Sequence, residues 1–251
     1  MLDRRLLWVT SVVAVALGLS ACSGSSVKAV SAPSASRTTR ATSPVSPTGY
    51  PTATSSTLRS VLVLKKALIQ LNDLPSGFAI EPVNSSSDAG GAASSKDPNC
   101  AALVRLSNAK TAPGSRASAD VSVSGGQDGP FVDESIDALG SENTVAALQI
   151  SLKSAVAACH QMTVTIPGQG SSTMKVTEVS APKFGAHPFA VRMTATGGSL
   201  NGLEMTQVTA GVKDVVVSLT FVAALPDDVN GGTETAVGKA EGILGVSTSG
   251  V

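Results

Sequence analysis

The stretch LEMTQVTAGVKDVVVSLTFVAAL, residues 203–225, holds two runs of strand-forming residues on either side of Lys213 and Asp214. Valine and threonine are frequent in both runs, and these residue types are enriched in β-strands. A two-residue polar connection between two such runs is typical of a tight hairpin. The stretch therefore predicts two adjacent antiparallel strands.

Three similar runs precede this hairpin and extend the pattern. They are MTVTIP at residues 162–167, MKVTEVS at 174–180 and FAVRMTATG at 189–197. Glycine, proline or asparagine lies between consecutive runs, which places turns there. Five consecutive runs joined by turns predict an antiparallel meander. Another strand is expected at residues 117–125, where apolar and polar residues alternate.

Helical periodicity flanks the strands, because apolar residues recur at steps of three and four in four segments. These segments are residues 58–71, 98–106, 142–159 and 233–244. Asp97 before Pro98, and Ser141 before the third segment, are residue types that cap helix N-termini. We expect a loop at residues 84–96 and a turn with a short apolar insert at residues 126–140.

These elements predict one α+β domain over residues 58–251, in which helices flank and pack on an antiparallel meander. A domain of this length can bury one hydrophobic core. That core must be aliphatic, because the domain contains five Phe and neither Trp nor Tyr. Aromatic platforms that stack bases or sugars are therefore not expected.

The N-terminus predicts export and lipidation. Two arginines precede a run of 14 uncharged residues, 6–19, which is shorter than the roughly 20 residues of a membrane-spanning helix. The sequence LSAC, residues 19–22, resembles the bacterial lipobox. This resemblance implies that residues 1–21 are a signal peptide and that Cys22 becomes an acylated first residue, anchored to the extracytoplasmic face of the cell membrane. A plain signal peptide or a membrane helix with an incidental cysteine is the alternative.

Residues 22–57 predict a solvated tether rather than a folded segment. Ser, Thr, Ala and Pro dominate this segment, so it cannot bury enough apolar surface to offset its ordering entropy. Without residues 1–21, which contain two arginines and one aspartate, the chain has 16 basic and 17 acidic side chains. A near-neutral chain lacks the positive charge that binds a phosphate backbone, so nucleic acid is not an expected partner.

Two cysteines remain once Cys22 is assigned to lipid. Cys100 and Cys159 both fall on apolar helix faces, and an oxidising compartment favours their pairing. A catalytic thiol at Cys159 beside His160 is the alternative, but neighbouring residues on a helix point about 100° apart. We therefore expect one structural disulfide between Cys100 and Cys159.

The chain offers few constellations for catalysis or metal binding. Ser172 and Lys175 have the S-x-x-K spacing of penicillin-binding enzymes, but they lie in a predicted strand without the other motifs of those enzymes. The sequence has two histidines, His160 and His187. The cluster PDDVNGGTE, residues 226–234, lacks the calcium-loop spacing and is typical of turns and helix caps. We expect no enzymatic activity, no metal and no cofactor.

The order of these parts resembles actinobacterial cell-envelope lipoproteins whose domain is similar to the extracellular sensor domain of the serine/threonine kinase PknH. The motifs that carry the resemblance are LNDLPSGF at residues 71–78, DPNCAAL at 97–103, AACHQM at 157–162 and FAVRMTATG at 189–197. The resemblance implies an α+β fold with a central cleft for an unidentified ligand. It also implies bracing disulfides, of which Cys100 and Cys159 would match one.

This sequence departs from that pattern in two ways. It lacks cysteines for a second bridge and it lacks a kinase domain, so a signalling role transfers poorly. LpqN-type lipoproteins, which are similar to the Mog1/PsbP fold, are a second resemblance and imply protein interaction. Neither resemblance assigns catalytic residues.

Three hypotheses follow for the function. The first is a non-enzymatic, lipid-anchored ligand-binding or sensor-like module of the cell envelope, with a small molecule or lipid as its ligand. The second is an envelope protein that binds another protein through an exposed sheet edge or apolar patch. The third is a hydrolase that acts on envelope material. The sequence names no ligand-binding residue for any of them.

The lipidation site can be tested by one substitution. Cys22→Ala removes the thiol that would take the acyl chains, so the protein should be released to the medium or accumulate as an unprocessed precursor. Membrane fractionation and the mass of the N-terminal peptide measure both outcomes. A processed variant that stays on the membrane would refute the assignment.

Overall fold

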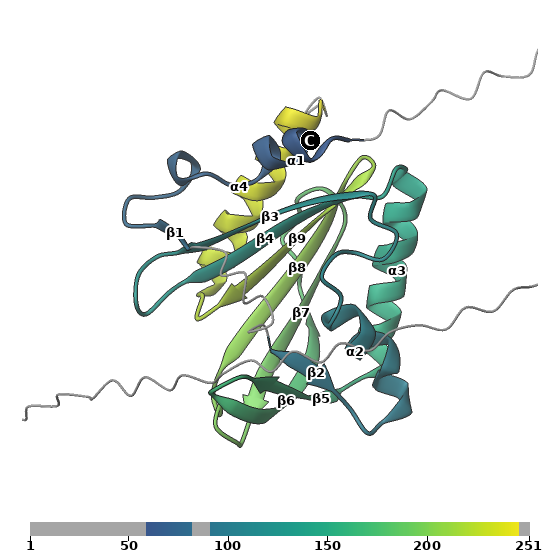
Figure 1. Cartoon of the computed structure of the whole chain (residues 1–251), viewed down its shortest axis with the longest axis vertical. Coiled ribbons are helices and arrows are strands. Elements are labelled where there is room, and N and C mark those ends of the chain that lie inside the picture. The colour runs from purple at the N-terminus through teal and green to yellow at the C-terminus, as the bar shows by residue number, and fades with distance from the viewer. Residues whose placement is uncertain (1–58, 82–90, 246–251) are drawn as a thin grey trace, which may run out of the picture. The chain divides into compact units, whose positions relative to one another are not determined.

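The structure is a computed structural model that describes residues 59–81 and 91–245 (Figure 1). The predicted signal peptide, the lipidation site Cys22 and the tether at residues 22–57 lie outside the described residues. Within the described ranges, no helix is long and apolar enough to cross a membrane. The described part has the predicted α+β class, with helices packed on an antiparallel sheet.

The sheet contains nine strands in the described part of the chain. The strands are β1 (Ala79–Glu81), β2 (Ala92–Ser94), β3 (Ala117–Ser124), β4 (Phe131–Ala138), β5 (Gln161–Ile166), β6 (Gly170–Val179), β7 (Ala186–Thr196), β8 (Glu204–Val212) and β9 (Val215–Val222). Their order across the sheet is β1-β3-β4-β9-β8-β7-β6-β5-β2. The predicted meander is confirmed, because β5 to β9 pair consecutively. The predicted hairpin joins β8 to β9, where Val212 pairs with Val215 and Lys213 has a φ of 53°.

Four α-helices and two short 3₁₀ helices accompany the sheet in the described ranges. They are α1 (Val61–Ala67), η1 (Leu71–Asp73), η3 (Pro98–Cys100), α2 (Ala101–Ser107), α3 (Glu142–Ala158) and α4 (Pro226–Leu244). The predicted caps are confirmed. The Asp97 carboxylate accepts the Asn99 N–H at 2.9 Å, and the Ser141 hydroxyl accepts the Thr144 N–H at 3.2 Å. Each cap satisfies one of the backbone donors that a helix start leaves unpaired.

The turn predicted at residues 126–140 is wrong, because most of this segment is the strand β4. Aspartate, glutamate and serine are uncommon in strands, and they obscured the alternation along FVDESIDA. In the structure, β4 pairs with β3 on one side and with β9 on the other. The strand therefore joins the N-terminal hairpin to the predicted meander.

Three boundaries differ from the sequence prediction. The last helix begins at Pro226 rather than at residue 233, so the cluster 226–234 is helical and not a turn. The loop expected at residues 84–96 contains β2, while residues 84–90 lie outside the described residues. The first helix ends at Ala67, and Leu71 belongs to η1 instead. Consecutive glycines in α4 and small residues in β2 hid these elements, because both residue types are poor helix or strand formers.

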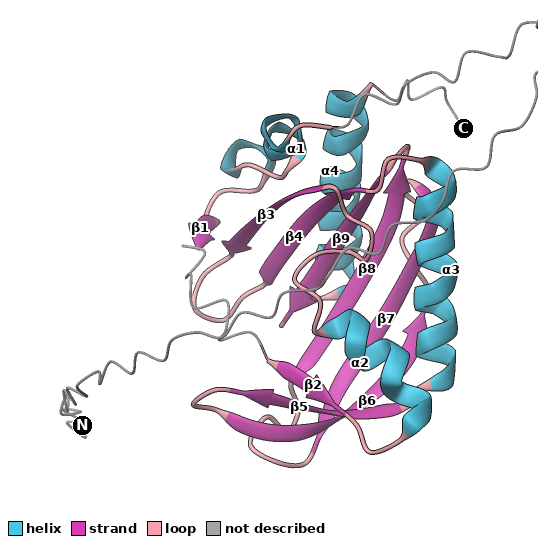
Figure 2. Ribbon diagram, turned by 45° about the vertical axis from the view of Figure 1, so that its right-hand side comes forward, coloured by secondary structure: helices cyan, strands magenta, loops and turns pink. Residues whose placement is uncertain are grey.

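Different helices cover the two faces of the sheet (Figure 2). On one face α1 and α4 pack on the larger apolar cluster, which includes Val217, Leu219 and Phe221 of β9. On the opposite face α2 and α3 pack on a second cluster built around β5, β6 and β7. Val216 of β9 belongs to a small third cluster beneath the start of α3. The central strand β9 thus contributes to a core on each face.

Two glycines allow the helices to approach the sheet closely. A Cβ at Gly211 of β8 would lie 2.9 Å from the Val145 side chain of α3. A Cβ at Gly232 of α4 would lie 2.8 Å from the Phe221 ring of β9. Both distances are shorter than real Cβ contacts, so a side chain at either position would push a helix away from the sheet. The close contact with Phe221 also explains why a glycine occupies position 232 inside α4, where glycine is about 1 kcal/mol less favourable than alanine.

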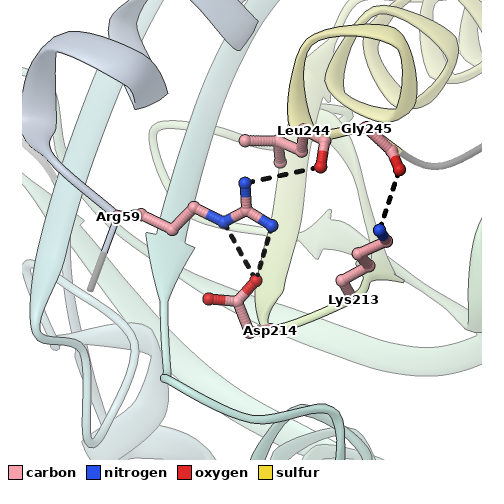
Figure 3. A network of polar contacts seen from close by, with 5 residues as sticks. All are labelled: Arg59, Lys213, Asp214, Leu244 and Gly245. Carbon is pink, nitrogen blue, oxygen red and sulfur yellow. Dashed lines mark hydrogen bonds and ion pairs between the residues drawn. The ribbon is translucent and has the colours of Figure 1, made fainter. Parts of the chain in front are cut away.

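The first described residue and the end of α4 meet at the β8–β9 turn (Figure 3). The Arg59 guanidinium contacts the Asp214 carboxylate at 2.9 and 3.0 Å, and it donates to the Leu244 carbonyl at 3.4 Å. The Lys213 ammonium donates to the Gly245 carbonyl at 2.8 Å. These contacts hold both ends of the described domain at one turn of the sheet.

A disulfide joins Cys100 and Cys159, as predicted, across 59 residues of sequence. Both cysteines are completely buried within the cluster of the α2/α3 face. Cys159 follows the last residue of α3, and Cys100 immediately precedes α2. The bond therefore fixes the two helices of this face to one another.

We expect the disulfide to stabilise the domain by about 4 kcal/mol, the chain-entropy value for a closed loop of this length. The double variant Cys100→Ala, Cys159→Ala should lower the free energy of unfolding by that order in a denaturant titration. Alkylation of the unreduced wild-type protein should leave both cysteines unlabelled. Labelling of both before reduction would show that the bridge is absent.

Candidate functional site

A small cleft opens on the α2/α3 face, above the middle of β4, β9 and β8. Its volume is about 120 Å³, and its walls come from α3 and from the segment that follows α2. Polar side chains from β4, α3, β8 and β9 line it: Ser135, Asp137, Gln149, Gln207, Thr209 and Ser218. Leucines that pack against the two apolar clusters of this face, Leu106, Leu148 and Leu152, are among its lining residues.

Sheet register brings three of these hydroxyl groups side by side. Ser135 of β4 pairs with Ser218 of β9, and Ser218 pairs with Thr209 of β8. Asp137 lies two residues further along β4, on the same face, opposite Val216. Because alternate residues of a strand share a face, the row of hydroxyls and the carboxylate point into one cleft.

Three buried side chains in the cleft each have an oxygen without a hydrogen-bond partner in the protein. Asp137, Gln149 and Thr209 are 2%, 4% and 5% exposed. Oδ1 of Asp137, Oε1 of Gln149 and Oγ1 of Thr209 have no hydrogen-bond partner in the protein. The Gln149 amide is oriented by its Nε2, which donates to the Ala186 carbonyl at 3.2 Å. A buried polar atom without a partner costs about 1–3 kcal/mol, so three in one cleft mark a place where a ligand would be stabilised.

The walls of the cleft are largely aliphatic. Leu106, Leu148 and Leu152 line its walls, and no aromatic ring does so among the described residues. Lys110 and Asp137 are the charged side chains of the lining in that same part of the chain. The cleft therefore presents polar oxygens on its floor and apolar walls.

A wider hollow lies on the other face of the sheet, beside η1 and α4. Its volume is about 530 Å³, and Ile69, Leu74 and Phe221 are among its lining residues. None of the described side chains with an unpaired buried atom lines it. Size alone would favour this hollow, but a binding site also needs polar groups that fix a ligand's orientation. The smaller cleft has these groups, so we take it as the candidate site.

The residues singled out from the sequence lie away from this cleft. His160 and His187 are exposed, and Lys175 is exposed on β6 while Ser172 is buried. The Ser172 hydroxyl accepts the Leu200 N–H at 2.8 Å, which gives it a structural role. Within residues 59–81 and 91–245, no group of three or more His, Cys, Asp or Glu side chains could hold a metal ion.

The cluster at residues 226–234 also has a structural role. Asp227, Asp228, Asn230 and Glu234 all lie on α4. The Asp228 carboxylate accepts the Leu225 N–H at 2.8 Å, which completes the N-terminal cap of the helix. Asp228 of this cluster therefore caps α4.

Sequence reasoning missed every polar residue of the cleft. Gln149 had a detectable signal, because it lies four residues after Val145 and three before Leu152, inside the apolar stripe of α3. Asp133, Ser135 and Asp137 occupy alternate positions of a segment in which Glu134 interrupts the apolar set, and a row of alternate polar residues is ordinarily a solvent-exposed strand face. No short motif connects residues 135, 149, 209 and 218.

With the geometry established, comparisons place the fold among known structures. The sequence matches no known family profile and no curated protein. The structure is similar to the crystal structure of the extracellular domain of PknH from Mycobacterium tuberculosis, with a TM-score of 0.53 at 13% sequence identity. The chain has the fold of that domain. The match covers 76% of this chain and 99% of the other, so the predicted resemblance is confirmed for the fold, and function must be argued from the site.

A second buried carboxyl group lies on the opposite face of β4. Glu134 is 2% exposed, and its Oε2 accepts the Ile69 N–H at 2.6 Å. Burial raises the pKa of Glu134 to about 7, against the opposing effects of the Ile69 hydrogen bond and the Lys239 charge. Burial alone would raise the pKa of Asp73. The ion pair with Lys239 and the hydrogen bond from the Gln70 N–H outweigh burial, so the pKa of Asp73 is lowered. Glu134 thus holds the segment after α1 against the sheet.

We expect Glu134 to make stability depend on pH. Its pKa of about 7 in the folded protein exceeds the unfolded value of about 4.3. Its contribution to the free energy of unfolding is therefore complete below pH 4 and is lost as the pH rises through 7. The free energy of unfolding of the wild type should fall by about 3 kcal/mol relative to Glu134→Gln between pH 4 and pH 8. Denaturant titrations across this range measure the difference.

Glu178→Gln is the matched control, because Glu178 is 45% exposed in an ion pair with Lys153. Its stability should parallel that of the wild type at all pH values between 4 and 8. Parallel curves for the wild type and Glu134→Gln would instead show that Glu134 titrates normally.

Proposed function

We propose that this protein is a lipid-anchored, non-enzymatic module that binds a small molecule outside the cytoplasmic membrane, in the cleft above β4, β8 and β9. One observation carries the proposal. Three side chains that are at least 95% buried direct unpaired oxygens into a single cleft. Burying these oxygens without hydrogen-bond partners destabilises the folded protein, and the fold does not require it. Hydrogen bonds from a bound ligand would offset this cost.

Features outside the cleft support the extracytoplasmic setting. The disulfide between Cys100 and Cys159 is typical of an oxidising compartment. The fold is shared with a domain that is extracellular in its own protein. The N-terminal sequence up to Cys22 resembles a lipobox, and residues 22–57 would hold the domain away from the membrane.

Binding is favoured over hydrolysis by the composition of the cleft. Acid–base or nucleophilic catalysis needs a His, a second carboxyl group or an activated nucleophile within hydrogen-bond reach. Asp137 is the one carboxylate that lines the cleft in the described part of the chain, where neither His160 nor His187 reaches it. A serine row without a histidine in the cleft favours binding over nucleophilic catalysis.

Binding is also favoured over docking through a sheet edge. The outermost strands of the described sheet, β1 and β2, are three residues long. Short edge strands offer few free backbone groups, and natural proteins use them to discourage pairing with another chain. Protein interaction through the sheet edge is therefore the weaker hypothesis.

Native mass spectrometry can test the function directly. Full-length protein purified from the envelope of an actinobacterial host, in a mild detergent and without added polyols, should carry a discrete extra mass that denaturation removes. Ser218→Leu fills the centre of the cleft and should weaken binding about tenfold, which is a loss of about 1.4 kcal/mol of binding free energy, so the occupied fraction should fall.

Thr220→Leu provides the matched control. It makes the same kind of change two residues along β9 on the same face, and Thr220 does not line the cleft. It should retain the extra mass. Equal occupancy in Ser218→Leu and the wild type would place the ligand elsewhere, and a wild-type protein without any extra mass would contradict the proposal.

A further inference from the structure

The outer side of helix α1 combines exposed apolar and exposed basic side chains. The inner side of this helix packs on the larger apolar cluster, where Leu64 and Ala67 are completely buried. The exposed positions are related by steps of three and four residues, so they share one side of the helix. These are the four residues of the α1 face: Val61, Leu62, Lys65 and Lys66.

The apolar half of the α1 face is widely open to solvent. Leu62 is 73% exposed, the largest fraction among the exposed large apolar side chains of the described residues, and Val61 beside it is 44% exposed. A single exposed leucine is ordinary on a protein surface. Two adjacent apolar side chains next to two lysines on one helix face are instead typical of a helix that lies in a membrane interface.

The basic half of the α1 face carries a net positive charge. None of the ion pairs among the described residues involves Lys65 or Lys66, and residues 59–72 contain no acidic residue. The nearby Arg59 guanidinium is already paired with Asp214. The two lysines therefore supply the charge at this helix that an anionic surface would attract.

The α1 face lies where the predicted tether joins the domain. Arg59, the first described residue, is held at the β8–β9 turn (Figure 3), and α1 begins two residues later. The predicted tether from Cys22 to residue 57 has 36 residues, a length at which a flexible linker spans roughly 30–36 Å on average. Such a linker lets the domain reach the membrane as well as leave it. The α1 face would therefore meet the lipid surface at a high effective concentration.

We propose that the α1 face docks on the anionic lipid surface to which Cys22 anchors the chain. Val61 and Leu62 enter the headgroup region, and the two lysines lie along it against lipid phosphates. Each lysine near such a surface favours the docked state about fivefold, an effect that is weak for a free protein but sufficient for a tethered one. Because α1 covers one face of the sheet and the cleft opens on the other, docking leaves the cleft open to solvent. This inference rests on the anchoring in the function proposed above and not on the cleft.

Tryptophan fluorescence tests the contact, because the one tryptophan of the sequence, Trp8, lies in the predicted signal peptide. The processed, lipidated Leu62→Trp protein is reconstituted in vesicles of phosphatidylcholine and phosphatidylglycerol in equal parts, with and without brominated acyl chains. Its emission should shift to the blue and be quenched by the bromine. Both effects should weaken in pure phosphatidylcholine and at high salt, which screens the attraction. The control is Ile150→Trp, on α3 over the opposite face and 67% exposed, which should show neither effect.

Removal of the two lysines tests the electrostatic part. Lys65→Gln with Lys66→Gln, added to Leu62→Trp, should lower the ratio of docked to undocked protein about 25-fold, the product of two fivefold effects. The matched control adds Lys153→Gln with Lys175→Gln instead. It removes the same charge from exposed positions on α3 and β6, and it should leave the quenching unchanged.

The outcomes separate docking from anchoring, because vesicle flotation and the mass of the N-terminal peptide report the anchor independently. A protein that floats while Leu62→Trp stays solvent-exposed and unquenched would overturn the docking and leave the anchor intact. Equal quenching in Ile150→Trp would show unspecific adsorption and would also overturn it. A protein that does not float would overturn the anchoring and the docking together. Protection of the indole in native envelope membranes, but not in lipid vesicles, would assign the α1 face to a protein partner instead.

Discussion

The two faces of strand β9 pack against different environments, and the rest of the structure depends on the register that this requires. Val217, Leu219 and Phe221 enter the core beneath α1 and α4, while Ser218 and Thr220 face the other way. Because side chains alternate along a strand, a register slip of one residue would bury the polar set and expose the apolar one. Core packing under α4 therefore fixes the register of β9. That same register aligns Ser218 with Ser135 and Thr209, so the core on one face determines the polar row on the other.

The cleft exists because the helices of the second face are held in place at both ends. Near its start, α3 packs against the sheet at Gly211, where only a residue without a Cβ leaves room for Val145. At its end, the disulfide joins Cys159 to Cys100, directly before α2. Leu106 of α2 lines the cleft, so the bond positions a wall of the site as well as stabilising the fold. Because the two helices are held in place relative to the sheet, the residues that line the cleft keep a defined geometry.

The sequence predicted the parts of the fold that depend on local patterns. The meander, its last hairpin, the Ser141 cap and the cysteine pair each follow from residues close in sequence or from residue type. Strand β4 was missed because Asp133, Glu134 and Asp137 are poor strand formers, and only pairing with β3 and β9 stabilises them there.

The cleft was missed for a related reason. Serine and threonine on alternate strand positions are ordinary on a solvent-exposed face, and their burial depends on where α3 lies, which no local pattern specifies.

The two buried carboxyl groups of β4 show why one face is structural and the other is a candidate site. Glu134 and Asp137 are each 2% exposed, and they point to opposite faces because they are three residues apart on a strand. The structure provides for Glu134: a backbone N–H binds it, its pKa is raised to about 7, and it lines neither the cleft nor the hollow beside Ile69. Asp137 opens onto the cleft, and its Oδ1 has no protein donor. A buried charge persists only where something compensates for its desolvation. For Glu134, the Ile69 N–H binds Oε2 and the raised pKa favours the protonated form, while Oε1 has no partner in the protein. Oδ1 of Asp137 likewise has no protein donor, but Asp137 lines the cleft that we propose as the binding site.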